Sequence, residues 1–557
     1  MPGLDRGSDG VVRTGPVTRP EDAWLMSRRL PGEPGAEEGL LITIRNRTVS
    51  YMVDTVLVVG AGPTGLATAV HLALHDVPVR VVDAAPGPAT TSRALGLQPR
   101  GAEVLERLGA LGDLRERSRS LLNMYYKEGG RTVLRLQVGE VAKVLPKPTL
   151  LVSQAEVENV LRARFEQLGG KIEWSTRLVG ATQHGDRVVV DVEGAGGHPD
   201  ELTTNWLVGC DGAHSVVRKA AGIGFSGKKL IERLLMVDVQ ATGWPYDRDG
   251  SVTWMEASRM LSVTALPDDV WRVFTEPPPG LAEALTPEEI TDLVLAEFFR
   301  RSGLDPTSVG EVRWASEFRI HRRLADRYRL GRILLAGDAA HIQSPTGGQG
   351  QNTGLGDAEN LAWKLTLVAL GKADPRLLDT YEGERRPLAR SVLGATSTAV
   401  DIMLPDRYWK RMIRDHLVLP ALRLRAVQRR VWLAASQLGI SYRGGPLAAR
   451  SFRPWVRPRA GERVPDLHCV TAEGVPSTVH EAVKGRWVVL AGRQDVAREH
   501  AEVAARNLGD QLVATLRPTR GGWRDVVLMR PDGHVAWRGR PDPARMSAWL
   551  EENLWPG

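Results

Sequence analysis

The sequence predicts a protein of the α/β class, with an open parallel sheet, an inserted β-rich section and a further mixed domain near its C-terminal end. Three observations predict it. A buried strand, a helix and a second strand follow one another over residues 53–83, which is the unit that a parallel sheet requires. Short β-type runs fill residues 232–275 with few helix signals. After a linker rich in Arg, Pro and Gly at 442–466, strand and helix patterns alternate again.

Length and composition narrow the classes of protein. The 557 residues are 42% hydrophobic and 25% charged, which suits two to four domains of roughly 100 to 200 residues. No long uncharged apolar run and no signal-peptide order is present, so we expect a cytoplasmic protein without a membrane partner. The net charge is +7, but Lys and Arg are mostly scattered and no nucleic-acid module accompanies them. We expect no nucleic-acid partner.

The densest basic stretch is 407–430. Its charges alternate with apolar residues at helical spacing, which favours a solvated face of an amphipathic helix over a polyanion or membrane site.

The two cysteines, Cys210 and Cys469, lie far apart in the sequence without a ligand cluster near either. This excludes a disulfide framework and a zinc site, so we expect both thiols to be reduced and structural. No other metal-ligand spacing and no Ser-His-Asp arrangement is evident, and we predict no metal.

Residues 1–51 are rich in Pro, Gly and mixed charge, and predict a disordered leader. Met52 opens the first buried strand and resembles a natural start. We therefore expect a chain that begins at Met52 to keep the fold.

A glycine-rich turn, GAGPTG at 60–65, falls between the first strand and the first helix. Gly60 permits a tight turn, Gly62 lets the backbone approach a pyrophosphate, and Gly65 lets the helix lie close to the strand. Asp83 ends the second strand, where its carboxylate can accept hydrogen bonds from a ribose hydroxyl. The pattern predicts a Rossmann-like domain that binds FAD or NAD(H).

Two later segments, 209–218 and 334–352, also follow predicted strands. Asp338 at a strand end can bind ribityl hydroxyls, and the glycine-rich turn after it can aim N–H groups at the edge of a reduced flavin. Simpler interpretations stay open. Asp338 can be a helix N-cap, Arg218 a surface ion-pair residue, and His341 a packed or capping residue and not an acid or base.

The glycine turn, the Asp211-Gly212 pair and the Gly337-Asp338 pair, in this order, resemble the class A flavoprotein monooxygenases typified by para-hydroxybenzoate hydroxylase. Within that family the match is to the longer aromatic polyketide and phenol hydroxylases, over about residues 53–400. The resemblance implies an FAD-dependent aromatic hydroxylase of antibiotic biosynthesis. It would use NAD(P)H and O2 to hydroxylate a bulky polyketide-like or phenolic substrate through a C4a-hydroperoxyflavin.

Two alternatives remain on the same scaffold: Baeyer-Villiger oxygenation, and a flavin reductase that does not oxygenate. The Trp-x-Trp-x-x-Pro signature of a flavin-dependent halogenase is absent.

The resemblance also implies site residues. Asp83 would contact the FAD ribose, Arg93 the phosphates and Gln154 the ribityl chain, while Asp211 and Arg218 would serve both FAD and NAD(P)H. Where family members commonly have Met, this chain has Gln351. The catalytic candidates beside the flavin are Pro345 and Gly348. The full cofactor set is Gly60, Gly62, Thr64, Gly65, Asp83, Arg93, Gln154, Asp211, Gly212, Arg218, Gly337, Asp338, Pro345, Gly348, Gly350, Gln351 and Asn352.

The β-rich section should cover the flavin. The apolar candidates for its ligand wall are Trp254, Met260, Trp271 and Phe274, although apolar residues at a period of two are more typical of a packed core.

The tail resembles the thioredoxin-like domain appended to phenol and polyketide hydroxylases, and without paired thiols it should be redox-silent. We expect a monomer or homodimer. The predicted division is a leader at 1–51, an FAD-binding domain at 52–224 and 321–400, a substrate domain at 225–320, connecting helices at 401–451 and a thioredoxin-like domain at 452–557.

Overall fold

The structure is a computed structural model. It describes residues 23–25, 40–44, 47–51, 54–90, 94–139, 148–256, 259–278, 280–281, 285–343, 348–405, 407–448, 456–519 and 523–555. Within the predicted leader, β1 (Ala23–Leu25), β2 (Leu40–Ile44) and β3 (Arg47–Tyr51) pair as a small sheet. The rest of residues 1–51, and Met52, lie outside the described residues, so the disorder expected there stays a prediction.

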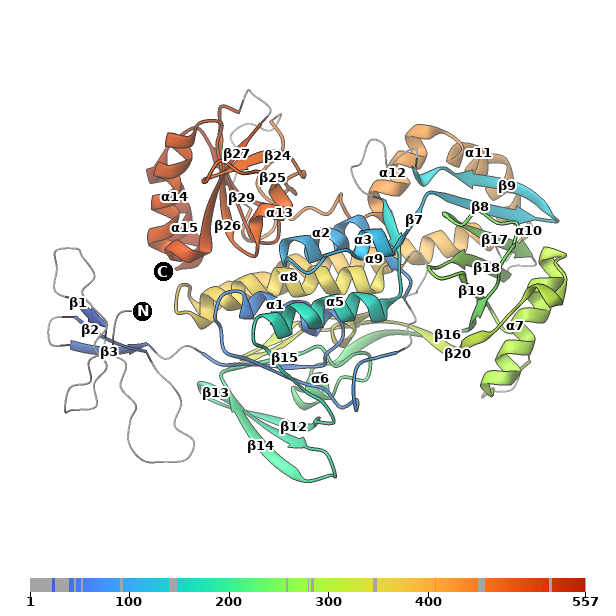
Figure 1. Cartoon of the computed structure of the whole chain (residues 1–557), viewed down its shortest axis with the longest axis horizontal. Coiled ribbons are helices and arrows are strands. Elements are labelled where there is room, and N and C mark those ends of the chain that lie inside the picture. Colours follow the sequence, from blue (N-terminus) through green and yellow to red (C-terminus); the bar gives the residue numbers. More distant parts are fainter. Residues whose placement is uncertain are drawn as a thin grey trace, which may run out of the picture.

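A six-stranded sheet forms the centre of the first domain, and five of its strands are parallel (Figure 1). In order they are β11 (Ile172–Glu173), β5 (Val79–Val82), β4 (Val56–Val59), β15 (Trp206–Gly209), β22 (Ile333–Leu335) and the antiparallel β21 (Arg329–Leu330). The β4 and β15 side chains are fully buried, as expected of strands that are covered on both faces. The carboxyl ends of β4, β15 and β22 therefore lie side by side.

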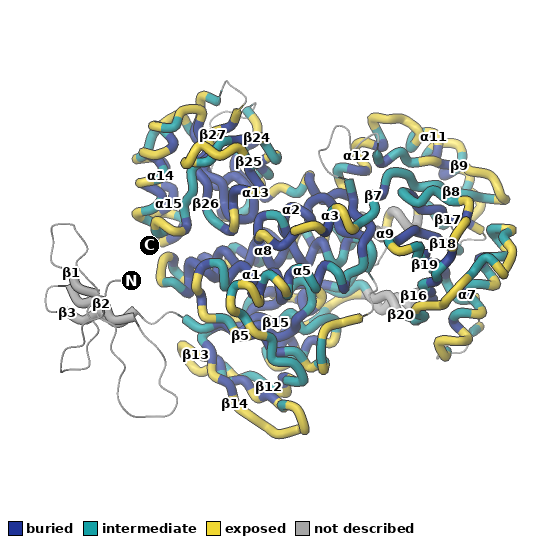
Figure 2. Tube along the Cα trace, viewed as in Figure 1, coloured by how far each residue is buried: buried dark blue, intermediate teal, exposed yellow. Residues whose placement is uncertain are grey.

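Helices pack on this sheet and around one another. α1 (Pro63–Ala73) lies against α8 (Gly350–Ala369) and α5 (Gln154–Gln167), and Figure 2 shows the continuous buried band that they form with the sheet. The remaining helices of the domain are α2 (Pro99–Arg107), α3 (Leu114–Arg117), α6 (Val216–Ala220), η2 (Gly337–Ala339), η3 (Pro375–Leu378) and α9 (Asp379–Met403). One small sheet consists of β6 (Gly96–Leu97), β10 (Thr149–Leu151) and β7 (Arg119–Leu121). A second consists of β12 (Arg177–His184), β13 (Arg187–Glu193) and β14 (Pro199–Thr204).

An eight-stranded sheet forms the second domain. Its order is β23 (His341–Ile342), β20 (Val312–Ala325), β16 (Phe225–Gln240), β19 (Val270–Thr275), β18 (Arg259–Ala265), β17 (Gly250–Glu256), β8 (Asn123–Glu128) and β9 (Arg131–Leu136). The β8–β9 hairpin comes from the segment that the sequence assigned to the FAD-binding domain. It joins because β8 pairs in parallel with β17, a contact between residues far apart in the chain.

One face of this sheet packs against α7 (Pro287–Ser302), which is followed by the short η1 (Pro306–Ser308). Trp254 and Trp271 lie in this core with Phe298 of α7. Phe274 and Met260 lie on the opposite face of the same strands and are only partly buried. The period-two pattern thus separates the four candidates into two core residues and two residues that do not belong to that core.

Four short helical segments follow α9: α10 (Tyr408–Ile413), the π-helical η4 (Arg414–Val418), α11 (Leu419–Leu422) and α12 (Arg425–Ala435). They pack on the β8–β9 hairpin, where Gln428 accepts a hydrogen bond from the Gln137 N–H. The predicted solvated basic face holds for α12, where Arg425, Arg429 and Arg430 are exposed. In α10 the exposed side chains are apolar instead, and Arg414 in η4 is buried.

The C-terminal domain has a six-stranded sheet. Its strands are β25 (Pro476–Thr478), β24 (His468–Thr471), β27 (Val513–Pro518), β26 (Trp487–Leu490), β28 (Val526–Met529) and β29 (Val535–Gly539), with α13 (Val479–Val483), α14 (Gln494–Leu508), η5 (Asp510–Leu512) and α15 (Pro543–Leu554). The predicted α/β fold class with an inserted sheet is confirmed. Both cysteines are free, Cys469 on β24 and Cys210 beside the glycine turn.

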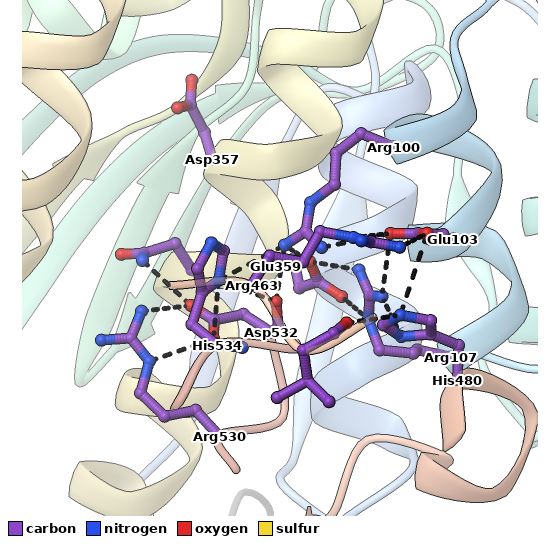
Figure 3. A network of polar contacts seen from close by, with 12 residues as sticks. Arg100, Glu103, Arg107, Asp357, Glu359, Arg463, His480, Arg530, Asp532 and His534 are labelled. Atoms are coloured by element: carbon purple, nitrogen blue, oxygen red, sulfur yellow. Dashed lines mark hydrogen bonds and ion pairs between the residues drawn. The ribbon is translucent and has the colours of Figure 1, made fainter. Parts of the chain in front are cut away.

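Charged side chains fill the interface between this domain and α2 and α8 (Figure 3). Arg107 of α2 donates to both carboxylate oxygens of Glu359 on α8, at 2.5 and 2.8 Å, and to His480 at 2.7 Å. Arg100 donates to the Asp532 carbonyl oxygen at 2.6 Å. All of these side chains are buried. The C-terminal domain is therefore joined to the first domain by paired charges that solvent does not reach.

Candidate FAD site

The glycine turn has the geometry that its sequence predicts. Gly60 has φ +105°, and a Cβ there would lie 2.4 Å from the Cys210 carbonyl oxygen. A Cβ on Gly65 would lie 1.9 Å from the Gly60 carbonyl oxygen, so helix α1 can approach the turn only without a side chain. A Cβ on Gly62 would meet no atom within 4 Å. The space in front of Gly62, at the N-terminus of α1, is open to a phosphate group.

Asp83 has an additional role that the motif does not reveal. Its carboxylate accepts hydrogen bonds from the Ala61 N–H at 2.7 Å and from the Ala85 N–H at 2.8 Å. The first of these fixes the glycine turn. A carboxylate has about four acceptor positions, so Asp83 can hold the turn and still accept a bond from a ribose hydroxyl.

Asp211 supports the start of helix α6, beside the N-cap residue Ser215. It accepts hydrogen bonds from the Val216 and Val217 N–H groups at 2.6 and 3.1 Å and from the Ser215 hydroxyl at 2.5 Å. The neighbouring Gly212 has φ +76°. The Asp211 carboxylate thus organises the whole turn after β15 through backbone donors.

Arg218 on α6 is 5% exposed. It donates to the Ala339 and Ala213 carbonyl oxygens at 2.9 and 3.2 Å, and its guanidinium stacks 3.8 Å from the Phe225 ring centroid. Among the described residues Arg218 forms no ion pair, which argues against its interpretation as a surface ion-pair residue. Arg218 links the turn after β15 to the turn after β22.

Asp338 lies in the turn after β22. Its side chain is open to solvent, yet protein atoms crowd around it closely enough that desolvation raises the pKa of its carboxyl. Nearby His341 opposes that rise, and Asp357 adds to it. Among the described residues the carboxylate has no hydrogen-bond partner, and it does not cap η2. A free acceptor at this point suits a ligand that carries hydroxyl groups.

Two side chains beneath this turn hold it in place. Thr64 of α1 is wedged between Gly337 and Gly354, because a Cβ on either glycine would come within 2.6 Å of its hydroxyl oxygen. Asp357 of α8 accepts a hydrogen bond from the Gly337 N–H at 3.2 Å and one from His341 at 2.5 Å. His341 is thus buried with its Nε2 engaged by Asp357, while its Nδ1 has no partner among the described residues. The pairing with Asp357 favours the interpretation of His341 as a packing residue.

The glycine-rich loop before α8 is held from below by Asn352. Its amide donates to the Gly96 and Gly348 carbonyl oxygens at 2.9 and 2.8 Å and accepts from the Gln98 N–H at 2.8 Å. Both of its N–H groups are occupied, so Asn352 positions the loop through the backbone.

Two buried polar atoms near the start of α8 have no protein partner. They are Nε2 of Gln351 and Oε1 of Gln343, and Gly350 lies beside Gln343. Buried polar atoms of this kind normally have a partner, and a polar ligand beside them would supply one. The residues of the site therefore fit a flavin dinucleotide: open space at a helix N-terminus, a free carboxylate and unsatisfied amides.

Comparisons with known proteins agree with this geometry. The model of the FAD binding domain family matches residues 54–396, and that of the aromatic-ring hydroxylase C-terminal family matches residues 457–554. A 6-methylpretetramide 4-monooxygenase of Streptomyces rimosus is 32% identical over 87% of this chain and 90% of its own length.

The chain belongs to the FAD-dependent aromatic-ring monooxygenases.

Other relatives of this monooxygenase extend the match. A flavin-dependent monooxygenase of Mycobacteroides abscessus is 34% identical over 86% of this chain and 96% of its own length. The solved structure of OxyS anhydrotetracycline hydroxylase from Streptomyces rimosus has a TM-score of 0.73 at 30% identity, over 91% of this chain and 100% of that chain. The protein is therefore an FAD enzyme that uses NAD(P)H and hydroxylates aromatic compounds.

Not every predicted site residue of the monooxygenase can be placed. Arg93 and Pro345 lie outside the described residues. Gln154 donates to Glu158 at 2.8 Å, where burial raises the pKa of the Glu158 carboxyl and the charge of Asp83 adds to the rise. Gln154 is thus linked through Glu158 to the surroundings of Asp83, and its contact with the ribityl chain stays a prediction.

Asp357 and Arg385 are site residues that the motifs missed. Burial opposes ionisation of Asp357, yet Arg385 and His341 hold the pKa of its carboxyl below the usual value. Arg385 donates to it at 2.7 Å from α9 and also to the Thr353 carbonyl oxygen at 2.9 Å. A sequence signal existed. Thr353, Asp357, Asn360 and Lys364 recur at helical spacing along one side of α8.

Proposed function

We propose that this monooxygenase hydroxylates a polycyclic aromatic substrate, polyketide-like or phenolic, at a site between the FAD-binding residues and the eight-stranded sheet. The relatives named 6-methylpretetramide 4-monooxygenase and anhydrotetracycline hydroxylase support this substrate class. We further propose that the enzyme works in the cytoplasm as a monomer or homodimer.

The observation that carries the proposal is the character of the sheet face opposite α7. Strand pairing places Thr253 opposite Ser262 on that face, and their hydroxyls lie 3.0 Å apart. Phe274 and Met260 share the face. A mixture of hydroxyl, sulfur and aromatic groups suits a ligand with flat apolar rings and several oxygen atoms. We propose this face as the wall of the substrate site.

Each FAD-binding residue would act on a different part of the cofactor. Open space at Gly62 and the N–H groups of α1 would hold the pyrophosphate, and the carboxylate of Asp338 would accept a bond from the ribityl chain. The N-terminus of α8, with Gly348 and Gly350, would offer a positive dipole to the negative edge of the reduced ring. Bound FAD supplies the hydride acceptor for NAD(P)H and the group that activates O2.

The chain itself positions these groups and excludes water. Nε2 of His341 is bound to Asp357, and the free carboxylate of Asp338 would bind the ribityl chain, so we propose neither group as an acid or base in the reaction. Four polar side chains of the site form hydrogen bonds with backbone N–H or carbonyl groups of the turns: Asp83, Asp211, Asn352 and Asp357. The contribution of the protein to the reaction is therefore geometric and electrostatic.

The test is oxygen incorporation. Purified yellow enzyme is incubated with polycyclic phenols and quinones under ¹⁸O₂, while NAD(P)H oxidation is followed. A substrate should stimulate NAD(P)H oxidation and gain one labelled hydroxyl on a ring. A lactone product would show Baeyer-Villiger oxygenation instead, and stimulated oxidation without label in the product would show a reductase.

A matched pair of variants ties the activity to the site. Gly62→Ala should fold normally, because its Cβ meets no protein atom, and should lose FAD and turnover. Gly87→Ala is the control, because a Cβ there also meets nothing within 4 Å. Full FAD content in Gly62→Ala would contradict the proposed pyrophosphate position.

A further inference from the structure

An unusual surface lies at the end of α9 and on the helices that follow it. Eight of the thirteen large apolar side chains that are exposed in the described part of the chain fall within residues 402–431. They are Ile402, Tyr408, Trp409, Met412, Ile413, Leu417, Leu424 and Val431. Single exposed apolar residues are normal on any protein, but such a concentration marks a contact surface. We call these eight side chains and the basic residues between them the apolar-basic face.

Helix geometry explains how the face forms. Segments α10, η4 and α11 continue one another over residues 408–422, and the spacing of the exposed residues places them on one side. Tyr408 is 77% exposed, Trp409 54% and Leu417 67%. On the inner side, Arg414 is buried and paired with Glu128 at 2.6 Å and Asp415 at 2.7 Å. Several large apolar groups therefore face the solvent on these segments while a charged one, Arg414, is buried.

The charge of the face is as unusual as its apolar content. Residues 407–431 contain eight Lys and Arg residues against a single Asp. Without the buried Arg414 and its partner Asp415, seven basic residues remain and the net charge of this stretch is +7. Arg425, Arg429 and Arg430 are exposed on α12, next to Leu424 and Val431. Whatever covers the face must accept apolar and aromatic groups and neutralise a concentrated positive charge.

The apolar content and the positive charge of the face indicate which kind of partner can bind to it. In a two-fold dimer the same surface would meet itself, and the repulsion between two sets of like charges would oppose that contact. A spanning helix is not available, because no helix of the described residues is long and apolar enough to cross a membrane. Trp, Tyr, Leu and Arg together are typical of helices that lie in the plane of a lipid–water interface.

We propose that the apolar-basic face docks on an anionic phospholipid bilayer, with the exposed apolar side chains in the headgroup region and the arginines against lipid phosphates. The protein would be peripheral and reversibly bound. This inference departs from the sequence-based expectation that the protein has no membrane partner. It does not rest on the proposed substrate.

The experiment uses the holoenzyme and two kinds of vesicle, one of phosphatidylcholine with phosphatidylglycerol and one of phosphatidylcholine alone. Co-sedimentation should show binding to the anionic vesicles and release at high salt, because exposed charges are screened. In the double variant Trp409→Ser/Leu417→Ser, the lipid concentration for half-maximal binding should rise about tenfold or more. The control Trp555→Ser removes a tryptophan that is 50% exposed on another domain, and should bind like the parent protein.

Folding is checked by FAD content and melting temperature, which should be the same in the three proteins. Failure of the parent protein to bind anionic vesicles at low salt would overturn the proposal, as would equal binding by the double variant. Sedimentation velocity supplies a further arm. A dimer that the double variant dissociates would show that a second copy covers the face and that the lipid proposal is wrong.

Discussion

At the residue scale, the site separates into side chains that hold the loops and side chains that remain free. Asp83, Asp211 and Asn352 are bound to backbone groups, whereas Asp338 has no partner among the described residues. Motif matching places all four in the cofactor site but does not distinguish the two roles. Only the surrounding hydrogen bonds do so, because they depend on how each turn folds and, for Asn352, on Gly96 and Gln98, which are distant in the chain.

Asp338→Ala tests the free carboxylate. The variant should lose a hydrogen bond to a charged acceptor, about 1.5 to 3 kcal/mol, and bind FAD roughly ten- to a hundred-fold more weakly. Since the carboxylate has no protein partner, the melting temperature of the apoprotein should not fall. Flavin absorbance after dialysis and apoprotein melting curves measure both effects. Asp292→Ala, an exposed position on α7, is the control. FAD affinity equal to that of the parent protein would exclude a ribityl contact.

Asp211→Ala and Arg218→Ala test the linked turns. Removing the Asp211 carboxylate at the start of α6 should cost about 1 to 2 kcal/mol of stability, since two N–H groups lose their acceptor. Both variants should retain more flavin than Asp338→Ala but be reduced slowly by NAD(P)H, as the family resemblance implies. Stopped-flow reduction and denaturation together separate these effects. Lower stability with an unchanged reduction rate would leave Asp211 and Arg218 with a structural role only.

At the element scale, the sequence predicted the helices and strands that depend on local patterns of apolar residues. The β4–α1–β5 unit, the strands at 187–208 and the helical section after 352 all lie close to their predicted places. The placement of β8 and β9 in the eight-stranded sheet could not be predicted, because β8 pairs in parallel with β17 more than a hundred residues away. The outward apolar side of α10 was missed for a similar reason: periodicity gives the faces of a helix but not which face is buried.

Helix α8 carries both the flavin loop at its start and the domain interface further along. Glu359→Gln should destabilise the protein by about 3 to 5 kcal/mol, since it leaves two buried arginines short of a counter-charge. The matched control is Glu173→Gln in the exposed Arg80–Glu173 pair, which also has two hydrogen bonds and should cost less than about 1 kcal/mol. Urea denaturation measures both. Similar losses of unfolding free energy in the two variants would mean that the buried Glu359 pairs stabilise the protein no more than an exposed pair does.

At the scale of the whole molecule, buried histidines at the interface predict acid sensitivity. Burial lowers the pKa of His534 to about 4, and it also lowers the pKa of His480 and of His71 well below the usual value. The unfolded chain takes up these protons near pH 6.5, so stability is complete above that pH and is lost as the pH falls toward 4.

For His534 alone the loss should reach roughly 2 kcal/mol at pH 5. Melting temperatures between pH 8 and pH 5 should therefore fall, and the fall should be smaller in His534→Asn than in the parent protein. His198→Asn, at an exposed position, should leave the curve unchanged. An identical pH dependence in His534→Asn and the parent protein would assign the acid sensitivity to other groups.

The paired charges between the domains also bear on how such enzymes can be recombined. Arg107 and Glu359 of the first domain depend on one another and on His480 of the C-terminal domain, and all three are buried. In a chimera whose C-terminal domain comes from a relative, the residues of that domain that contact Arg107 and Glu359 would be those of the relative. Any mismatch would leave a buried charge on the helix whose first turn borders the flavin loop. Successful exchanges should therefore carry α2 and α8 together with the donor's C-terminal domain.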